Sequence, residues 1–540
     1  RHPWSLPFAF LLIVIVLSSL YFAQAQVIIS SPPTTPLSPA THVGQALADC
    51  SVVFIIEETL AHPTKKNITL TVMPAETADL YVEYGKDSGV YTSSTLSQRI
   101  SAGVQGRFLL DGLEPGKRYF YRLRCKNTAS STYDARPEYS FRTLRGGNAT
   151  FSFIVFADSH LYALYTRANN DNVCGTNVSG FNTAKTSLLY FNQSLQNFLP
   201  PDVDFVLVGG DEAMTHCPTC SQCMVRGEDS GVGTVGSLRE AELRYELILS
   251  PTYYGQVTKY LPVFYKLGNH DGEPGFSDAV GTCDNYDTLL NYSQQARLRY
   301  VPNASDVYPG GPSGSYYSFS SGNAQFIILD VMNGPTQYPQ QASDWTLGPD
   351  QLAWLETVLT STKKQWTFIF AEHLVGGLSD PAGHCYYYGR GGLKATDNGE
   401  LNGTFLGEQA RLDDLMNTYN ATVFFSSHDH VALAGEKRDA TGQGEGVYYV
   451  TSGKSSNIGG AWLSQSWFVD TMDYDNNGIA DYLEGRWGSD HSGFFKVTVQ
   501  GSEQVDVAYL GSDYQNMTNN GQPLFSFTVY ANGSSTLPPF

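Results

Sequence analysis

Runs of apolar and β-branched residues recur from the middle of the chain onward, and polar residues with reactive or metal-binding side chains follow them directly. A continuous run of four to eight such residues is typical of a strand that is buried on both faces. Five of these runs lie at 151–156, 205–208, 261–267, 367–370 and 422–425. Because open α/β sheets build their sites beyond the carboxyl ends of strands, the residues after these runs are candidates for one shared site.

Apolar residues at helical spacing separate these runs. Helices are expected at 187–198, 237–249, 349–359 and 408–419. In the third, Leu352, Leu355 and Leu359 share one face, and Pro349 stands near the start, where its missing N–H is tolerated. Strands that alternate with amphipathic helices predict an α/β domain. Two late strands, at 494–499 and 504–509, predict that this domain continues nearly to the end of the chain.

The region from Cys50 to Arg145 instead shows short alternating strands separated by turns. They are expected at 68–73, 80–84, 107–110, 119–125 and 139–143. This spacing predicts a small β-sandwich. Leu113-Glu-Pro115 followed by Tyr119 resembles the fibronectin type III pattern, in which a tyrosine corner leads into a strand.

The first residues have the pattern of a secretory signal. An apolar stretch at 8–22 ends in Ala23-Gln-Ala25, a small-residue cleavage pattern. An uncleaved signal anchor is the alternative, for which the stretch is short. We therefore expect a signal peptide at 1–25, a Ser/Pro/Thr-rich spacer at 26–49, a fibronectin type III-like domain at 50–146, an α/β domain at 147–512 and a C-terminal tail at 513–540.

Composition and net charge exclude some classes of protein. The 540 residues are 41% hydrophobic and 13% aromatic, which excludes a disordered chain. The formal net charge of −19 makes the long-range field unfavourable for nucleic acid and for anionic membrane surfaces. We expect neither nucleic-acid binding nor stable membrane insertion once the signal is cleaved.

Cysteines and sequons both point to export. The eight cysteines form an even set, which permits complete disulfide pairing in an oxidising compartment. Asn-X-Ser/Thr sequons begin at Asn67, Asn148, Asn177, Asn192, Asn291, Asn303, Asn402, Asn420, Asn516 and Asn532. We expect a secreted, extracellular glycoprotein. Cys217, Cys220 and Cys223, beside His216, have the spacing of a metal knuckle, with disulfides as the alternative use.

The polar segments at the strand ends carry the donors of a two-metal hydrolytic site. Asp158 and His160 lie two residues apart, as do His428 and His430, and in extended backbone such pairs project to one side. A divalent pair needs a bridging carboxylate, neutral imidazoles and a position left open for water and substrate. Five of the eleven histidines fall in these segments: His160, His270, His373, His428 and His430.

The ordered set of segments resembles the calcineurin-like metallophosphoesterase family, from about Phe151 to the final strands. The segments are Asp158-Ser-His160, Gly210-Asp211, Gly268-Asn-His-Asp271, Glu372-His373 and Ser427-His-Asp-His430. The resemblance implies that the α/β part is a metallophosphoesterase domain, a layered α/β/β/α sandwich. It also implies a first metal bound by Asp158, His160 and His430, a second bound by Asn269, His373 and His428, and a bridging Asp211.

The same resemblance assigns the chemistry. His270 would protonate the leaving oxygen and Asp271 would orient its ring, while a hydroxide held by the two ions attacks a small phosphoester substrate in line. Ser427 stands where the family usually has glycine, a change that removes no donor.

The domain order resembles that of the purple acid phosphatases, including the Val82-Glu-Tyr-Gly85 strand. Two positions depart from that pattern: His160 replaces a glycine, and Met214 replaces the tyrosine that ligates ferric iron. We therefore expect a colourless enzyme that binds two divalent or mixed transition-metal ions of Fe, Mn or Zn. Arg390 is a candidate contact for the substrate phosphate, with an ordinary surface arginine as the alternative.

A second metal signal lies at 473–484, which matches the twelve-position calcium loop with glycine at its sixth position. Its oxygen donors are Asp473, Asp475, Asn477, the backbone of Ile479, Asp481 and Glu484. An acidic, solvated turn is the alternative. The short flanks resemble the isolated calcium loops of secreted proteins, so we expect bound Ca²⁺ in a structural role.

These observations predict a secreted two-metal phosphoester hydrolase, most simply a phosphomonoesterase of the acid phosphatase type. A phosphodiesterase acting on nucleotides or phospholipid headgroups is the first alternative, since the same site can attack either ester. The second is an adhesion or matrix glycoprotein with an idle metal site.

Overall fold

The computed structural model describes residues 50–160, 178–213, 215, 238–271, 286–332, 346–373, 408–428, 430–438, 444–455, 483–489, 491–512 and 520–537. Several predicted features lie outside these ranges: the signal peptide and spacer, Met214, the three-cysteine cluster, Arg390 and residues 473–482 of the calcium loop. None of the helices in the described part of the chain is long and apolar enough to cross a membrane.

The N-terminal part is built of strands, as predicted. They are β1 (Phe54–Ala61), β2 (Ile68–Pro74), β3 (Ala78–Gly85), β4 (Ser93–Ser94), β5 (Gln98–Ile100), β6 (Gly106–Leu110), β7 (Arg118–Asn127), β8 (Asp134–Ala135) and β9 (Tyr139–Arg142). Each of the five strands expected here is present, with ends within two residues of the prediction. β1 was not predicted, because Glu57-Glu58-Thr59 interrupts its apolar pattern.

Alternation along β7 explains how this part packs. Tyr119, Tyr121, Leu123 and Cys125 are buried, and the residues between them are only half-buried. Cys125 forms a disulfide with Cys50, which ties the start of the described chain to the middle of the sandwich. The hydroxyl of Tyr119 accepts a hydrogen bond from the backbone N–H of Glu114 at 3.0 Å, the contact expected of a tyrosine corner.

From residue 151 onward strands and helices alternate. The strands are β10 (Phe151–Phe156), β11 (Phe205–Val208), β12 (Val263–Tyr265), β13 (Tyr317–Ser321), β14 (Ala324–Ile328), β15 (Trp366–Phe370), β16 (Val423–Ser426), β17 (Ala432–Arg438), β18 (Gly444–Ser452), β19 (Leu483–Ser489), β20 (Gly493–Gln500), β21 (Gln504–Gly511) and β22 (Pro523–Tyr530). The helices are α2 (Val178–Gln196), α3 (Leu238–Ile248), α4 (Gly255–Thr258), α5 (Tyr286–Tyr300), α6 (Gly348–Ser361) and α7 (Glu408–Thr418), with single 3₁₀ turns η2 (Asn269–Asp271) and η3 (Ala304–Asp306).

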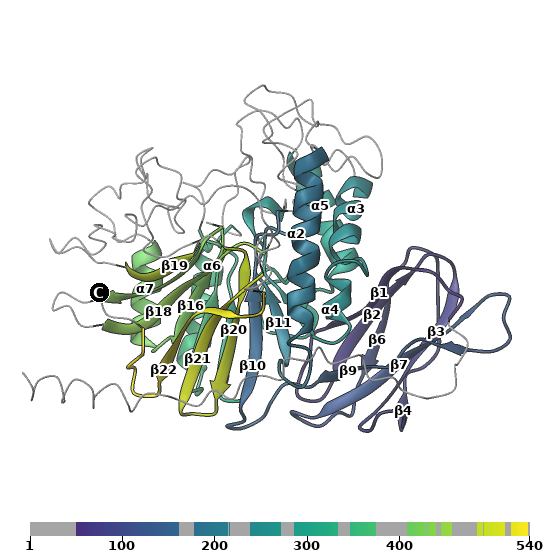
Figure 1. Cartoon of the computed structure of the whole chain (residues 1–540), viewed down its shortest axis with the longest axis horizontal. Helices are drawn as coiled ribbons and strands as arrows, with labels where there is room; N and C mark the ends of the chain where they lie inside the picture. The colour runs from purple at the N-terminus through teal and green to yellow at the C-terminus, as the bar shows by residue number, and fades with distance from the viewer. Residues whose placement is uncertain are drawn as a thin grey trace, which may run out of the picture. The chain divides into compact units, whose positions relative to one another are not determined.

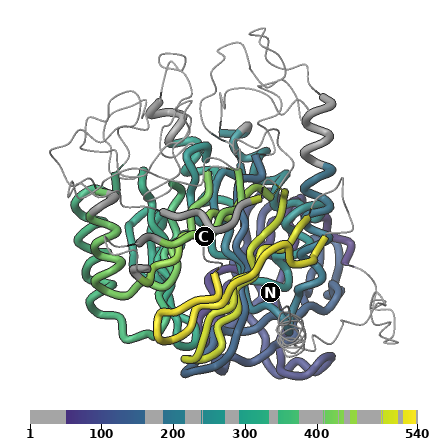
Figure 2. The backbone as a smooth tube through the Cα atoms, turned by 60° about the vertical axis from the view of Figure 1, so that its left-hand side comes forward, coloured from purple at the N-terminus to yellow at the C-terminus, as the bar shows by residue number. Residues whose placement is uncertain are grey.

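Together with the N-terminal strands they form two large sheets among the described residues, and a smaller third sheet contains only N-terminal strands, β4-β3-β7-β8 with β5 and β9. One large sheet has the order β22-β21-β20-β10-β11-β12-β1-β2-β6 and the other β13-β14-β15-β16-β18-β17-β19. Strands β10, β11 and β12 are parallel to one another, as are β14, β15, β16 and β18. In Figure 2 the late strands, coloured yellow, run beside the blue β10, with which β20 pairs antiparallel.

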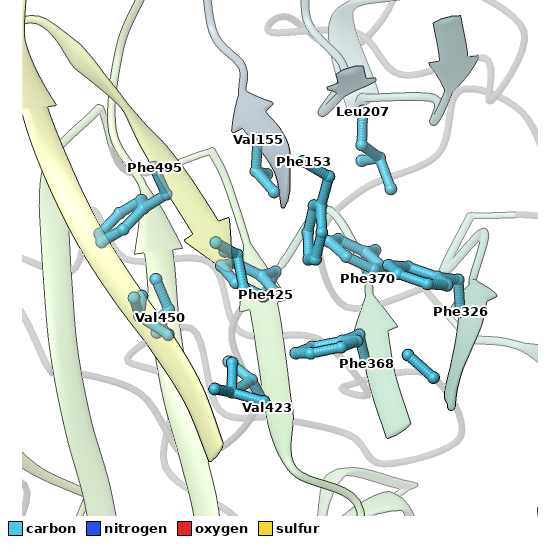
Figure 3. Packing of buried hydrophobic residues seen from close by; sticks show 14 of the residues in the cluster. Phe153, Val155, Leu207, Phe326, Phe368, Phe370, Val423, Phe425, Val450 and Phe495 are labelled. Carbon is cyan, nitrogen blue, oxygen red and sulfur yellow. The ribbon is translucent and has the colours of Figure 1, made fainter. Parts of the chain in front are cut away.

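The two large sheets face each other across an aromatic core. Phe153 and Val155 of β10 pack with Phe326, Phe368 and Phe370 of the opposite sheet (Figure 3). The alternate residues of β10, Ile154 and Phe156, point the other way and pack with α2 and α4. Helices α6 and α7 cover the outer face of the second sheet (Figure 1). The layers are therefore helix, sheet, sheet and helix, which confirms the predicted fold class.

The large sheet does not end where the sandwich begins. Parallel strand β1 lies beside β12, with Ala61 opposite Val263, and β2 and β6 continue the same sheet. At the other edge β22, in the segment expected to be a C-terminal tail, pairs along β21. The strand-rich N-terminal part therefore shares a sheet with the α/β part.

A buried ion-pair cluster strengthens this junction. Glu58 of β1 is fully buried, and Arg136 Nε lies 2.8 Å from its Oε1. Arg136 also binds Glu57 Oε1 at 2.8 Å, and Lys259, after α4, lies 3.4 Å from Glu57 Oε2. Two carboxylates are thus matched by two cations.

Candidate metal centre

The five polar segments meet at one edge of the facing sheets. Those after β10, β11 and β12 belong to the nine-stranded sheet, and those after β15 and β16 belong to the seven-stranded sheet. Within each sheet the strands concerned are parallel, so their carboxyl ends lie at a common edge. The backbone N–H of His428 donates to Asp158 Oδ1 at 3.1 Å and joins the two edges. The arrangement expected from the sequence is therefore present.

Donor atoms of three other candidate ligands lie around His160 Nε2. His160 Nε2 lies 3.0 Å from His430 Nε2, 3.1 Å from Asp211 Oδ2 and 3.4 Å from Asp158 Oδ1. His430 Nε2 is 3.8 Å from the same Asp158 oxygen. In a tetrahedral site with bonds of about 2.0–2.1 Å, neighbouring ligand atoms lie about 3.3–3.4 Å apart. Ligand atoms of Asp158, His160 and His430 all lie within 4.8 Å of one another, so these three can share a single ion.

A second group of donors lies beside the first. Asn269 Oδ1 is 3.0 Å from His428 Nδ1, and the ring of His373, which is fully buried, lies 4.3 Å from that of His428 between centroids. Asp211 and His428 each bring a ligand atom to within 4.8 Å of the other. Because Asp211 lies close to His160 as well as to His428, it is the candidate for a bridging carboxylate.

The backbone at the donors is left-handed, which corrects one step of the sequence reasoning. Asp158, His160, Asp211, His428 and His430 have φ of 55°, 41°, 57°, 72° and 58°. The two i, i+2 pairs therefore do not converge through extended backbone, as their spacing implied, but through tight turns. A non-glycine residue in this conformation costs about 1–3 kcal/mol and persists only where its surroundings enforce it. The strain is concentrated at the candidate donors.

Asp271 organises the loops around this point. Its Oδ2 accepts from the N–H groups of Gly268 at 2.9 Å and Asp211 at 3.1 Å, and its Oδ1 accepts from Ala213 N at 3.2 Å. Burial raises the pKa of Asp271 to about 6, although these N–H groups act against the shift. The contacts tie the loop after β11 to the loop after β12. The role of Asp271 as orienter of the His270 ring stays a prediction.

Glycine is required at position 268 by the same packing. A β-carbon there would lie 2.1 Å from Asp211 Oδ1, far inside van der Waals contact. That oxygen also accepts the backbone N–H of His270 at 2.8 Å. His270 itself is partly buried, with its ring centroid 4.9 Å from that of His160. The Gly-Asn-His-Asp motif thus holds His270 beside the convergent donors.

Buried negative charge at this edge exceeds the positive charge paired with it. The fully buried carboxyl groups are those of Asp158, Asp211, Glu212, Asp271 and Glu372. Lys266, which is equally buried, forms an ion pair with Glu372. Burial and the neighbouring carboxylates of Glu372 and Asp211 raise the pKa of Asp158 well above its usual range. Burial, with the charge of Asp271, does the same to the pKa of Asp211.

This excess is what bound cations would offset, because isolated buried carboxylates are strongly disfavoured. The donor set of imidazole nitrogens and carboxylate and amide oxygens suits divalent transition metals. The residues present therefore fit the two-metal group that the sequence implies.

Sequence reasoning missed three contacts behind the donors. Lys266 Nζ lies 3.0 Å from the hydroxyl of Ser427, and that hydroxyl lies 2.6 Å from Glu372 Oε2. Separately, the Tyr254 hydroxyl donates to Glu212 Oε2 at 2.6 Å. The replacement of a family glycine by Ser427 was a signal in the sequence that the turn carries an added contact.

Other predicted positions lie outside the described residues, namely Met214, Arg390 and most of the calcium loop. Glu484, the last predicted calcium donor, belongs to β19, where it stands opposite Glu436 of β17. Ligation by this loop stays a prediction.

Comparison with known proteins gives a consistent result. The family model described as calcineurin-like phosphoesterase matches residues 151–432, more than half of the chain. Purple acid phosphatase 13 of Arabidopsis thaliana is 24% identical over 396 residues, which cover 70% of this chain and 58% of that protein. The chain thus matches less than two thirds of the length of this curated relative.

Two solved structures share the fold. The structure of PhoD superposes with a TM-score of 0.60 at 15% identity, covering 90% of this chain and 93% of PhoD. The purple acid phosphatase PPD1 from yellow lupin (Lupinus luteus) seeds superposes with a TM-score of 0.54 at 16% identity, covering 88% of this chain and 74% of that one.

Proposed function

This chain belongs to the calcineurin-like phosphoesterase family, and on that premise we propose that it hydrolyses phosphomonoesters with two bound metal ions. The observation that carries the proposal is the approach of Asp158, Asp211 and His430 to His160 Nε2, at 3.0–3.4 Å, beside a second donor group that contains Asp211. We assign Asp158, His160 and His430 to the first ion, Asn269, His373 and His428 to the second, and Asp211 to both.

The chain's own groups supply positioning and a proton. When bound, the two ions would stabilise charge on the phosphoryl oxygens and make water nucleophilic near neutral pH. We assign His270 as the proton donor to the leaving oxygen, since this residue is partly exposed and a ring nitrogen lies within 4.8 Å of ligand atoms of His160 and Asp211. Its backbone N–H is fixed to Asp211 Oδ1, so the ring is carried by the same loop contact that places the bridging carboxylate.

The metal pair is divalent or mixed, drawn from Fe, Mn and Zn. This proposal rests on His160 and Met214, which stand where the purple acid phosphatase pattern has glycine and a ligating tyrosine. Without a phenolate ligand the protein should be colourless. A tyrosinate-to-metal absorption band in the visible spectrum of purified protein would contradict it.

The test is hydrolysis of a monoester and a diester reporter by purified protein loaded with each metal in turn. We expect faster turnover of the monoester and loss of turnover in His270→Ala and Asp211→Asn. If both variants hydrolyse at the wild-type rate, the activity does not come from this site and the proposal is wrong. Faster turnover of the diester would favour the phosphodiesterase alternative.

Export is proposed on three supports. They are the signal-like stretch at 8–22, the Cys50–Cys125 disulfide and four exposed sequons, at Asn148, Asn291, Asn420 and Asn532. Asn192 is fully buried and donates to Leu188 O at 2.8 Å, so this sequon is accidental. Enzymatic deglycosylation followed by peptide mass mapping of protein from a eukaryotic host should find glycans at exposed sites and none at Asn192.

We also retain the proposal of a structural Ca²⁺ at 473–484, which rests on the loop's donor spacing. Asp473→Ala with Asp475→Ala should abolish any stabilisation by added Ca²⁺ in a thermal melt. Unchanged stabilisation in that double variant would remove the assignment.

A further inference from the structure

Glu372 has two carboxylate oxygens in different surroundings. Oε2 is held by the ammonium of Lys266 and by the hydroxyl of Ser427 at 2.6 Å. Oε1 is just as buried, but in the described part of the chain it has no hydrogen-bond partner. Leaving a buried charged oxygen unsatisfied is costly. The anchored side chain therefore holds an oxygen ready for a group that the polypeptide does not supply.

The surroundings of Glu372 indicate what this group is. Ligand atoms of Glu372, Asp211 and His428 all lie within 4.8 Å of one another. The carboxyl groups of Glu372 and Asp211 are both fully buried. Two carboxylates packed against each other and against an imidazole repel one another unless a cation lies between them.

We propose that Glu372 is an additional ligand of the second metal ion, through Oε1, and that Lys266 and Ser427 are the residues that position it. The inference rests on the proposed two-metal function and adds to it. Neither composition nor the motif order assigned Glu372 as a ligand. The second position then offers oxygens from Asp211, Asn269 and Glu372 besides two imidazoles, whereas the first offers two carboxylates and two imidazoles.

Lys266 and Ser427 both hold Oε2 of Glu372, and this anchoring gives the two residues a role at the metal site. A glutamate side chain is long, and fixing Oε2 at two points leaves Oε1 only one place to lie. The charge of Lys266 also offsets part of the negative charge that a third carboxylate ligand adds. Ser427 directly precedes His428, so a single turn sets both an anchor of Glu372 and a nitrogen ligand of the same ion.

The consequence is selectivity between the two positions. Carboxylate and amide oxygens suit Mn²⁺, whereas a four-donor site with two imidazoles suits tetrahedral Zn²⁺. The second position, with three oxygens and five protein donors, should therefore prefer Mn²⁺ more strongly than the first does.

The test measures metal binding rather than turnover. Metal-free wild type and Glu372→Gln are dialysed against graded Mn²⁺, and bound metal is quantified by elemental analysis. Wild type should bind two equivalents, and Glu372→Gln should hold one as before and the other at least tenfold more weakly, a loss of about the size seen when a metal's supporting shell is removed. Two equivalents bound with wild-type affinity would overturn the inference.

Glu212→Gln is the matched control. Glu212 is as buried as Glu372 and follows Asp211 directly, but its carboxylate turns to the Tyr254 hydroxyl. The glutamine can still accept that hydrogen bond, so both Mn²⁺ equivalents should remain. If Glu212→Gln loses Mn²⁺ as Glu372→Gln does, the effect is one of buried charge in general and the ligand assignment fails.

Two milder variants keep the inference testable if Glu372→Gln does not fold. Ser427→Gly restores the family residue and removes one anchor, so it should weaken the second equivalent by a smaller factor. Lys266→Met should weaken it too. Where Glu372→Gln does fold, combining it with Lys266→Met should add nothing, since both changes act through one carboxylate. Wild-type Mn²⁺ affinity in Ser427→Gly and Lys266→Met, or additive losses in the double variant, would overturn the positioning role.

These outcomes are separable from failure of the proposed function. A wild-type protein that binds no metal or hydrolyses no phosphoester would remove the proposed function itself. A wild-type protein that binds two ions and hydrolyses the monoester, with metal binding unaltered in Glu372→Gln, would remove only the role of Glu372.

Discussion

Two clusters of charge lie towards opposite ends of β12, since Lys259 precedes that strand and Lys266 follows it, and they are built on different principles. At the junction with the sandwich, Glu57 and Glu58 are matched by Arg136 and Lys259 through contacts of 2.8–3.4 Å. At the strand ends, five fully buried carboxyl groups are accompanied by an ion pair from Lys266. The first cluster is neutral by itself, whereas the second requires positive charge from elsewhere.

The difference separates a structural cluster from a functional one without reference to sequence motifs. In the matched cluster the neighbouring cations lower the pKa of Glu57 against the effect of burial. In the unmatched cluster burial raises the pKa of Asp158, Asp211 and Glu372, that of Glu372 to about 8. Carboxyl groups in the two clusters should therefore respond oppositely to pH and to metal.

The largest effect is expected from Asp211→Asn, because the bridging position belongs to both donor groups. Turnover of a phosphomonoester should fall by about 10³-fold or more, the scale seen when a group that works as part of a unit is removed. Steady-state kinetics and elemental analysis of the same preparation measure it. Retention of both metals with full turnover would mean that Asp211 does not bridge.

Next in size is Arg136→Met, which should break the matched cluster. Leaving Glu58 buried and unpaired should lower the free energy of unfolding by about 3–5 kcal/mol. Denaturant titration gives this value, and metal content at low denaturant should stay at the wild-type level. Loss of metal in the folded variant would show that the two clusters are coupled rather than independent.

Metal removal should act only on the unmatched cluster, with a definite pH dependence. The folded-state pKa values of Asp271, at about 6, and Glu372, at about 8, are raised above those of ordinary carboxyl groups. The metal-free fold therefore binds protons more tightly than the unfolded chain, and its stability should fall as pH rises from about 4 to about 8.

Bound metal replaces those protons and should remove the decline. The difference in Tm between metal-loaded and chelator-treated protein should thus be larger at about pH 8 than at about pH 5. Thermal melts at both pH values measure it. A difference that shrinks as pH rises would contradict the assignment of the cluster to metal.

The smallest effect is expected from Tyr119→Phe, which removes one hydrogen bond from the sandwich. Loss of the contact with Glu114 N should cost about 1 kcal/mol of stability and leave turnover unchanged. Tyr530→Phe, on the exposed side of β22, is a control expected to be neutral. Equal effects of the two changes would mean that the tyrosine corner contributes nothing.

Local pattern was enough to predict the five strands that lead into the site, but not β13, β14, β17, β18 and β19 of the second sheet or helix α5. The runs at 151–156 and 205–208 coincide with β10 and β11, and Glu408–Thr418 ends one residue before the predicted helix does. Such runs are predictable because burial on both sheet faces leaves few polar positions. Local pattern did not predict β1. The burial of Glu58 in this strand depends on its ion pair with Arg136, which lies 78 residues away along the chain.

The candidate site was predictable in its members but not in its geometry. A position directly after a predicted strand was sufficient to identify Asp158, Asp211 and His428 as candidate metal ligands. It could not show the left-handed turns, nor that Lys266, Glu372 and Ser427 from three different strand ends would meet. Those contacts depend on how two sheets face each other, and one strand's sequence contains no information on that.

The left-handed backbone at the donors also bears on how this protein can change. At φ of 41°, glycine is the residue that position 160 accommodates most easily, yet glycine has no imidazole. The same conflict holds at Asp158, Asp211, His428 and His430. At each of these positions, substitution by glycine would relieve the backbone strain but would also remove a metal donor. Selection for stability alone would therefore erode the site, so a thermostable variant sought by unguided screening should be checked first for loss of metal.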